Sequence, residues 1–134
     1  MRWRGGDLTQ AGEASAQVKQ TLRKLGFDPD TIRRVSVCMY EGEINMVIHA
    51  DGGTATVDIG LNDITITLAD QGPGIPDIQQ AMQAGYTTAG EVARDLGFGA
   101  GMGLPNMKRY SDELHVETQL GKGTTVTVRI RIPQ

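Results

Sequence analysis

The segment from Gly97 to Arg109 reads GFGAGMGLPNMKR and places four glycines, at every second position, directly before a helix-like stretch. Glycine lets a ligand approach the backbone closely, but it loses more conformational entropy on folding than other residues. Pro105 stands where a first helical residue is expected, and Lys108 and Arg109 follow within a turn. Such a helix start favours an anion. Taken alone, the segment predicts either a phosphate site or a flexible surface loop.

The composition limits the class of protein. The chain has 134 residues, with 13 Lys or Arg against 16 Asp or Glu, and a net charge of −3. We expect one domain over residues 1–134 and no general affinity for nucleic acid. The sequence shows no bilayer-spanning apolar run and no signal peptide, so we expect a cytoplasmic protein without membrane attachment. Cys38 has no second cysteine to pair with and is expected to be a small buried side chain.

Hydrophobic periodicity predicts the order of the elements. Gly26 ends a first amphipathic helix with Leu25 on its apolar face, and Asp30 is the expected cap of a second helix. The expected helices cover 11–25, 31–50, 77–84 and 104–111. Alternating apolar and polar residues predict two β-hairpins, formed by 53–60 with 63–70 and by 113–119 with 124–132. The fold class is therefore α+β: a two-layer sandwich of a mostly antiparallel mixed sheet, four-stranded or slightly larger, with helices on one face.

The helix over 31–50 is apolar nearly all round and should pack on more than one side. Glu41, Asn45 and His49 nevertheless recur on it at intervals of four, so they line one face. The stripe is either the wet face of the helix or part of a site. In a site, the Asn45 amide oxygen suits Mg²⁺ and the Glu41 carboxylate can take a proton from a nucleophile. Glu43 points elsewhere and is expected to be a surface charge.

The stretch DQGPGIP begins with an acid that closes a strand. Asp70 could accept a hydrogen bond from an amine, while Gly72 and Gly74 would make room for a flat ring. The alternative is a tight turn, because the GPG sequence is typical of turns.

Four motifs in one order, EGEINMVIHA, DQGPGIP, GFGAGMGLPNMKR and GKGTTVTV, resemble the GHKL (Bergerat-fold) ATPase superfamily. The resemblance implies ATP and Mg²⁺ as cofactors, Glu41 as the catalytic residue and Asn45 as the metal ligand. It also implies that the Gly123–Thr124 pair backs the adenine site and that the glycine-rich segment forms the hinge of an ATP lid. The implied ATP-binding residues are Asn45, His49, Asp70, Gly72, Gly74, Ile75, Thr87, Thr88, Gly97, Gly99, Ala100, Gly101, Met102, Gly103, Leu104 and Thr124.

Within the superfamily, the small size and the stretches GYTT and GLPNMKRYSDE resemble the stand-alone serine/threonine kinases of bacterial partner-switching systems. The resemblance implies phosphorylation of a STAS-type antagonist protein, and some members also bind a sigma factor. The resemblance does not decide whether the protein forms a homodimer. The segment AGEVARDLGFGAGMG is longer and richer in glycine than many family lids, so the contacts of Arg94 are not predicted.

Two other functions stay open at this stage. The first is an ATP-binding switch without kinase activity. The presence of Glu41 argues against it, because a protein that only binds ATP needs no general base. The second is a detached histidine-kinase ATPase domain. His49 and His115 are the only histidines, and neither lies in the N-terminal helix region where a phosphoacceptor would be expected.

Overall fold

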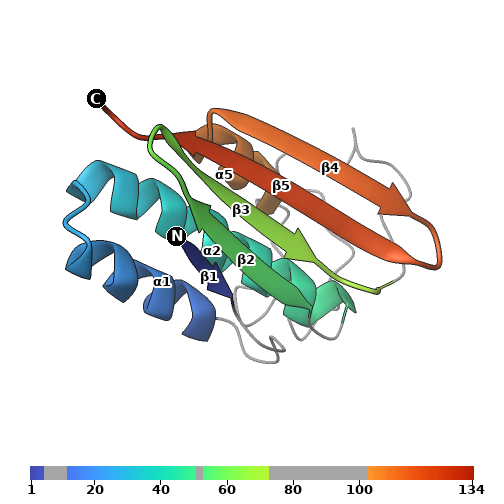
Figure 1. Cartoon of the computed structure of the whole chain (residues 1–134). Helices are drawn as coiled ribbons and strands as arrows, with labels where there is room; N and C mark the ends of the chain where they lie inside the picture. The colour runs from blue at the N-terminus through green and yellow to red at the C-terminus, as the bar shows by residue number, and fades with distance from the viewer. Residues whose placement is uncertain (5–11, 51–52, 73–102) are drawn as a thin grey trace.

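The computed structural model describes residues 1–4, 12–50, 53–72 and 103–134 (Figure 1). Over these residues the helices are α1 (Glu13–Lys24), α2 (Pro29–Ala50) and α5 (Gly103–Tyr110). The strands are β1 (Arg2–Arg4), β2 (Thr54–Ile59), β3 (Asp63–Ala69), β4 (Glu113–Gln119) and β5 (Gly123–Arg131).

The five strands form one sheet in the order β1-β2-β3-β5-β4, and the helices lie on one face of it (Figure 1). All four neighbouring pairs are antiparallel, so the described sheet contains no parallel pair and is not mixed. The expected α+β two-layer sandwich is confirmed. Both predicted hairpins are present, with strand ends within about one residue of the expected ones. The helix expected over 77–84 lies outside the described residues.

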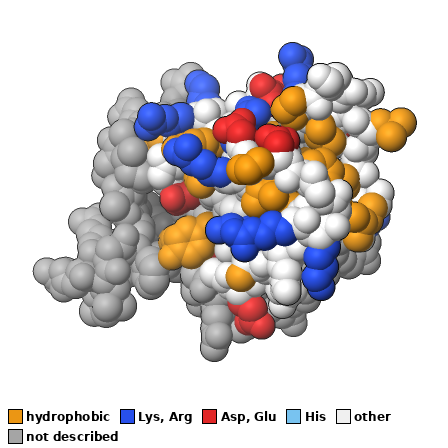
Figure 2. All heavy atoms as spheres, turned by 90° about the vertical axis from the view of Figure 1, so that its left-hand side faces the viewer, with side chains coloured by type: hydrophobic (Ala, Val, Ile, Leu, Met, Phe, Trp, Pro, Cys, Tyr) orange, Lys and Arg blue, Asp and Glu red, His pale blue; other side chains and the backbone are white. Residues whose placement is uncertain are grey.

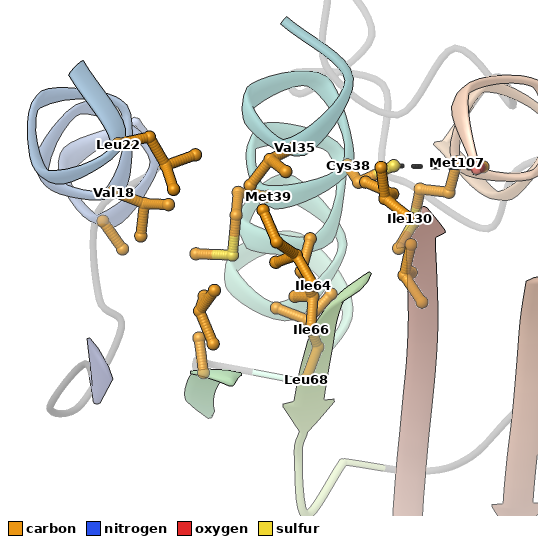
Figure 3. Packing of buried hydrophobic residues seen from close by; sticks show 14 of the residues in the cluster. Val18, Leu22, Val35, Cys38, Met39, Ile64, Ile66, Leu68, Met107 and Ile130 are labelled. Atoms are coloured by element: carbon orange, nitrogen blue, oxygen red, sulfur yellow. Dashed lines mark hydrogen bonds between the residues drawn. The ribbon is translucent and has the colours of Figure 1, made fainter. Parts of the chain in front are cut away.

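Helix α2 is the centre of the helical layer. Figure 3 shows it between α1 and α5, above β3 and β5. Val18 and Leu22 of α1 meet Met39 of α2, which in turn packs on Ile64 and its neighbours in the sheet. The prediction that α2 packs on more than one side is therefore confirmed, and burial of this apolar surface is the main stabilising contribution to the fold.

Cys38 lies where α2 packs against α5. It is fully buried, and its Sγ donates to the carbonyl of Met107 at 3.7 Å (Figure 3). Burial raises the pKa of the thiol to about 12, so the side chain is neutral at physiological pH. The expectation of a small buried side chain is confirmed.

Two local expectations were wrong. Leu25 follows the last residue of α1 and is 48% exposed, so it is not part of the apolar face. The cap of α2 is Asp28 rather than Asp30: its Oδ2 accepts from the Thr31 N–H at 3.0 Å, and its Oδ1 accepts from the Thr31 hydroxyl at 2.6 Å. The physical reason is Pro29, which suits the first helical position because it has no N–H to satisfy.

Strand β1 was not predicted. It pairs with β2 in the register Arg2 to Asp58, where the two side chains form an ion pair of 2.6 Å. Three residues are too few to show a period of two, so the sequence pattern carries no strand signal here.

Candidate functional site

Two polar residues of α2 face the first turn of α5. The Glu41 Oε1 accepts a hydrogen bond from the Asn106 Nδ2 at 3.1 Å. One turn further along α2, the Asn45 side chain lies directly against Gly103, where an added Cβ would come within 2.8 Å of the Asn45 Nδ2. The expected stripe is therefore not a wet face: both side chains are only partly exposed and are directed at α5.

Helix α5 begins at Gly103, so Pro105 is its third residue rather than its first. The first N–H groups of a helix have no acceptor within it, which makes this end of α5 suited to an anion. Lys108 and Arg109 do not contribute to that end, because they lie in the last turn. The Arg109 guanidinium stands 5.8 Å from the ring centroid of Tyr110.

Figure 2 views the end of the molecule where α1 ends and α2 begins, and Lys and Arg side chains are spread over that face.

A second group of residues lies where β3 ends and β5 begins. The Asp70 Oδ1 accepts from the Thr124 N–H at 3.1 Å and from the Gly72 N–H at 3.0 Å, and the Asp70 N–H donates to the Thr124 carbonyl at 2.9 Å. Gly123 has a φ of 134°, and a Cβ there would collide with the Asp70 carbonyl. Thr124 is buried, with its hydroxyl 2.9 Å from that of Thr118.

The bond from Gly72 forms an Asx turn over Asp70–Gly72, whereas the rest of the predicted turn, from Pro73 onward, lies outside the described residues. Because both hydrogen bonds within the described residues use Oδ1, the Asp70 Oδ2 can accept a further donor.

These two groups belong to one region. Met46, the residue after Asn45, packs at Gly53, where an added Cβ would lie 2.6 Å from the Met46 sulfur and 3.2 Å from the Asp70 Cβ. The C-terminal half of α2 therefore reaches the end of β3. The structure places Asp70 and Thr124 in direct contact, and it places Met46, the neighbour of Asn45 in the sequence, beside Asp70 at Gly53.

The remaining predicted residues are not placed. His49 lies in the last turn of α2, but its side chain is not described. The other expected members of the site lie outside the described residues: Gly74, Ile75, Thr87, Thr88, Gly97, Gly99, Ala100, Gly101 and Met102. Leu104 is described: it is buried in the hydrophobic core, so its side chain anchors α5.

Glu43 is not a surface charge. Its side chain is fully buried, and its carboxylate accepts hydrogen bonds from the N–H groups of Gly12 (2.8 Å), Ala14 (3.2 Å) and Ser15 (2.5 Å). The position before α1 is held by Gly12, which has no side chain to cap the helix. Glu43 of α2 supplies that cap, and its negative charge meets the positive end of α1.

The described residues contain no group of three or more His, Cys, Asp or Glu placed to hold a metal ion. No helix in the described ranges combines the length and apolarity needed to cross a membrane.

The described sheet and helices, with Glu41 and Asn45 of α2 facing α5, agree with the family that a comparison of sequences identifies. A sequence model of the histidine kinase-like ATPase domain matches residues 6–130, and the chain belongs to this family. Membership of an ATPase-domain family implies ATP binding.

Several relatives are similar over most of the chain. The serine/threonine-protein kinase RsbT of Bacillus subtilis is 32% identical over 112 residues, which cover 81% of this chain and 78% of that protein. The anti-sigma F factor of Geobacillus kaustophilus is 31% identical over 128 residues, covering 90% of this chain and 84% of that protein. The anti-sigma F factor of a Thermoanaerobacter species is 39% identical over 107 residues, which cover 75% of this chain and 71% of that protein.

A solved structure supports the fold. The RsbU and RsbW domains of a Mycobacterium tuberculosis protein match with a TM-score of 0.63 at 17% identity, over 100% of this chain and 33% of that one.

Proposed function

We propose that this protein is an ATP-dependent serine/threonine kinase of a bacterial partner-switching system. Its substrate is a STAS-type antagonist protein, and it also binds a sigma factor. The observation that carries the proposal is the pair Glu41 and Asn45, both turned toward the start of α5 in a chain similar to a kinase and to anti-sigma factors.

The residues at the strand end fit an adenine base. The Thr124 and Gly72 N–H groups fix the Asp70 carboxylate through Oδ1, which leaves Oδ2 to accept from an exocyclic amine. Gly123 keeps the backbone beside Asp70 free of a side chain. Asp70 and Thr124 would hold the base, and the glycine-rich segment before α5 would hold the phosphates.

The residues on α2 fit a magnesium nucleotide. Mg²⁺ is commonly held by one or two protein oxygens and by substrate phosphates rather than by a protein cage. The Asn45 amide oxygen lies against the first residue of α5 and is the proposed protein ligand. A site of this kind needs no cluster of acidic residues.

Glu41 carries the proposed chemistry. Its carboxylate accepts the proton of the incoming serine or threonine hydroxyl as that oxygen bonds to the transferred phosphorus. ATP would supply the phosphoryl group: the bond between its γ-phosphorus and the bridging oxygen breaks, and ADP leaves. The chain's own contribution is to position the hydroxyl and to stabilise charge at the phosphates, which are the main terms in phosphoryl transfer.

The test compares Glu41→Gln with Asn45→Ala in transfer from labelled Mg-ATP to a STAS-type protein of the same organism. Glu41→Gln should bind Mg-ATP normally and transfer about a hundredfold to ten-thousandfold more slowly. Asn45→Ala should lose both binding and transfer. Glu117→Gln, an exposed carboxylate on β4, is the matched control and should behave as the unmodified protein.

Other outcomes would favour another function. Transfer by Glu41→Gln at the unmodified rate would make Glu41 structural. ATP binding with no transfer to any partner would favour a nucleotide-dependent switch, and an acid-labile phosphorylated product would favour histidine-kinase chemistry.

A further inference from the structure

We infer that Asn106 is a positioning residue for the Glu41 carboxylate, and that it couples the candidate base to the first turn of α5. The inference rests on the proposed function, because it assigns Asn106 a part in the same reaction.

The contact is specific to two side chains. The Asn106 Nδ2 lies 3.1 Å from the Glu41 Oε1, and both residues are partly buried between α2 and α5. It is the one side-chain hydrogen bond that the described part of the chain gives to either residue. An ionised carboxylate only accepts hydrogen bonds and an amide NH₂ only donates them, so the polarity of the pair is fixed. Within the described residues Oε1 is the oxygen that is held, and Oε2 is the one assigned to take a proton.

Positioning matters for a base on a flexible side chain. Glutamate rotates about three side-chain bonds, and a general base must lie within hydrogen-bond reach of the proton it removes. The bond from Asn106 selects one orientation of the carboxylate before a substrate arrives. A misplacement of about 1 Å can cost on the order of a hundredfold in rate.

The contact also ties Glu41 to the phosphate end of α5. Asn45 packs against Gly103 and Glu41 bonds to Asn106, so α2 and α5 run antiparallel with two successive contacts. The buried Met107 holds α5 in place, through its packing and its bond from Cys38. The first turn of α5 thus contacts both candidate residues, and a nucleotide bound at its N-terminus acts on Glu41 through Asn106.

The decisive variant is Asn106→Asp. It keeps the size of the side chain but places a second carboxyl group at the Glu41 carboxylate. Two carboxyl groups at this distance cannot both ionise readily, so the pKa of the pair rises. The neighbouring Cys38 thiol, with a pKa of about 12, stays neutral throughout the range of the test. Asn62→Asp, in the exposed turn between β2 and β3, adds the same charge elsewhere and is the matched control.

The first measurement needs no partner protein. We follow the ¹³C signal of the Glu41 side-chain carboxyl against pH, assigned by its loss in Glu41→Gln. In Asn106→Asp the midpoint should rise by about one unit or more, and in Asn62→Asp it should match the unmodified protein. Equal midpoints in the two variants would overturn the inference.

The second measurement is transfer to the STAS-type protein. Asn106→Leu should slow kcat about tenfold to a hundredfold with the KM for ATP unchanged, and Asn106→Gln should restore part of the loss by keeping the donor. Equal kcat for Asn106→Leu and the unmodified protein would overturn the positioning role. If no variant transfers phosphate but the Glu41 midpoint responds to Asn106→Asp, the proposed kinase function fails and the contact stands.

Discussion

Asp70 and Thr124 are bonded to each other twice, by the Thr124 N–H to the Asp70 Oδ1 at 3.1 Å and by the Asp70 N–H to the Thr124 carbonyl at 2.9 Å. The pair continues the β3–β5 ladder beyond Ala69, where β3 ends. One carboxylate therefore stabilises the end of the sheet through Oδ1, and we propose that its second oxygen, Oδ2, accepts from a ligand.

Asp70→Asn separates these two roles. The asparagine carbonyl can still accept from Thr124, so the fold should persist, while the charged hydrogen bond to an adenine amine is lost. Such bonds contribute about 1.5–3 kcal/mol, so ATP should bind about tenfold to more than a hundredfold more weakly by calorimetry. Asp58→Asn, on β2 and paired with Arg2, is the control and should bind ATP normally. The unmodified protein should bind GTP poorly, because GTP has a carbonyl in place of the amine. Equal affinity for ATP and GTP would contradict the assignment.

Gly103→Ala tests the position of Asn45. The added methyl group would lie within 2.8 Å of the Asn45 Nδ2, so the amide must move. We expect about tenfold weaker binding of Mg-ATP, measured by calorimetry. Stability should fall little, because alanine is favoured over glycine in a helix by about 1 kcal/mol. Gly60→Ala, whose nearest neighbour would be the Asp63 carbonyl at 3.3 Å, is the control. Unchanged Mg-ATP affinity in Gly103→Ala would show that Asn45 does not ligate the ion.

Glu43→Ala should strongly destabilise the protein. It leaves three N–H groups at the start of α1 without their acceptor, which should cost about 2–4 kcal/mol in urea unfolding. Glu43→Gln keeps one acceptor oxygen and should lose less of the free energy of unfolding than Glu43→Ala. Glu13→Ala, an exposed acid in the first turn of the same helix, should cost less than about 1 kcal/mol. Equal losses for Glu43→Ala and Glu13→Ala would contradict the capping role.

The sequence predicted the elements whose periodicity is long enough to read. Helix α2 and the two hairpins span several periods each, so their positions and the α+β class followed from the pattern. The stripe of Glu41 and Asn45 was also visible, because an interval of four places both residues on one face of any helix.

The partners of these residues were not predictable, because they come from distant parts of the chain. Asn106 is 65 positions from Glu41 and shows no pattern of its own. Glu43 was misjudged because the start of α1 covers its face of α2, and the angle of a residue on its own helix does not reveal that cover. Gly12 before α1 was the available signal: a helix start without a capping side chain needs an acceptor from elsewhere.

Asp112 should make stability depend on pH at the acid end. The Asp112 Oδ2 accepts two hydrogen bonds, one from the Arg131 N–H at 2.7 Å and one from the Arg34 guanidinium at 3.1 Å. The bond from the Arg131 backbone, with the charge and hydrogen bond of Arg34, lowers the pKa of this carboxyl in the folded protein. A lowered folded pKa means that the unfolded chain takes up the proton first as the pH falls. The stabilisation is therefore fully present above the unfolded value of about 3.9 and is lost as the pH falls through the folded pKa.

Asp112→Asn removes this dependence and should lower the free energy of unfolding at pH 7 by about 1 kcal/mol, since the site is largely exposed. As the pH falls below about 4 and through the lowered pKa of Asp112 in the folded protein, the difference from the unmodified protein should shrink toward zero, because the Asp112 side chain then becomes neutral as well. Urea unfolding of the two proteins at a series of pH values measures this difference in the free energy of unfolding. A difference that stays constant from neutral to acid pH would show that the Asp112 charge does not contribute to stability.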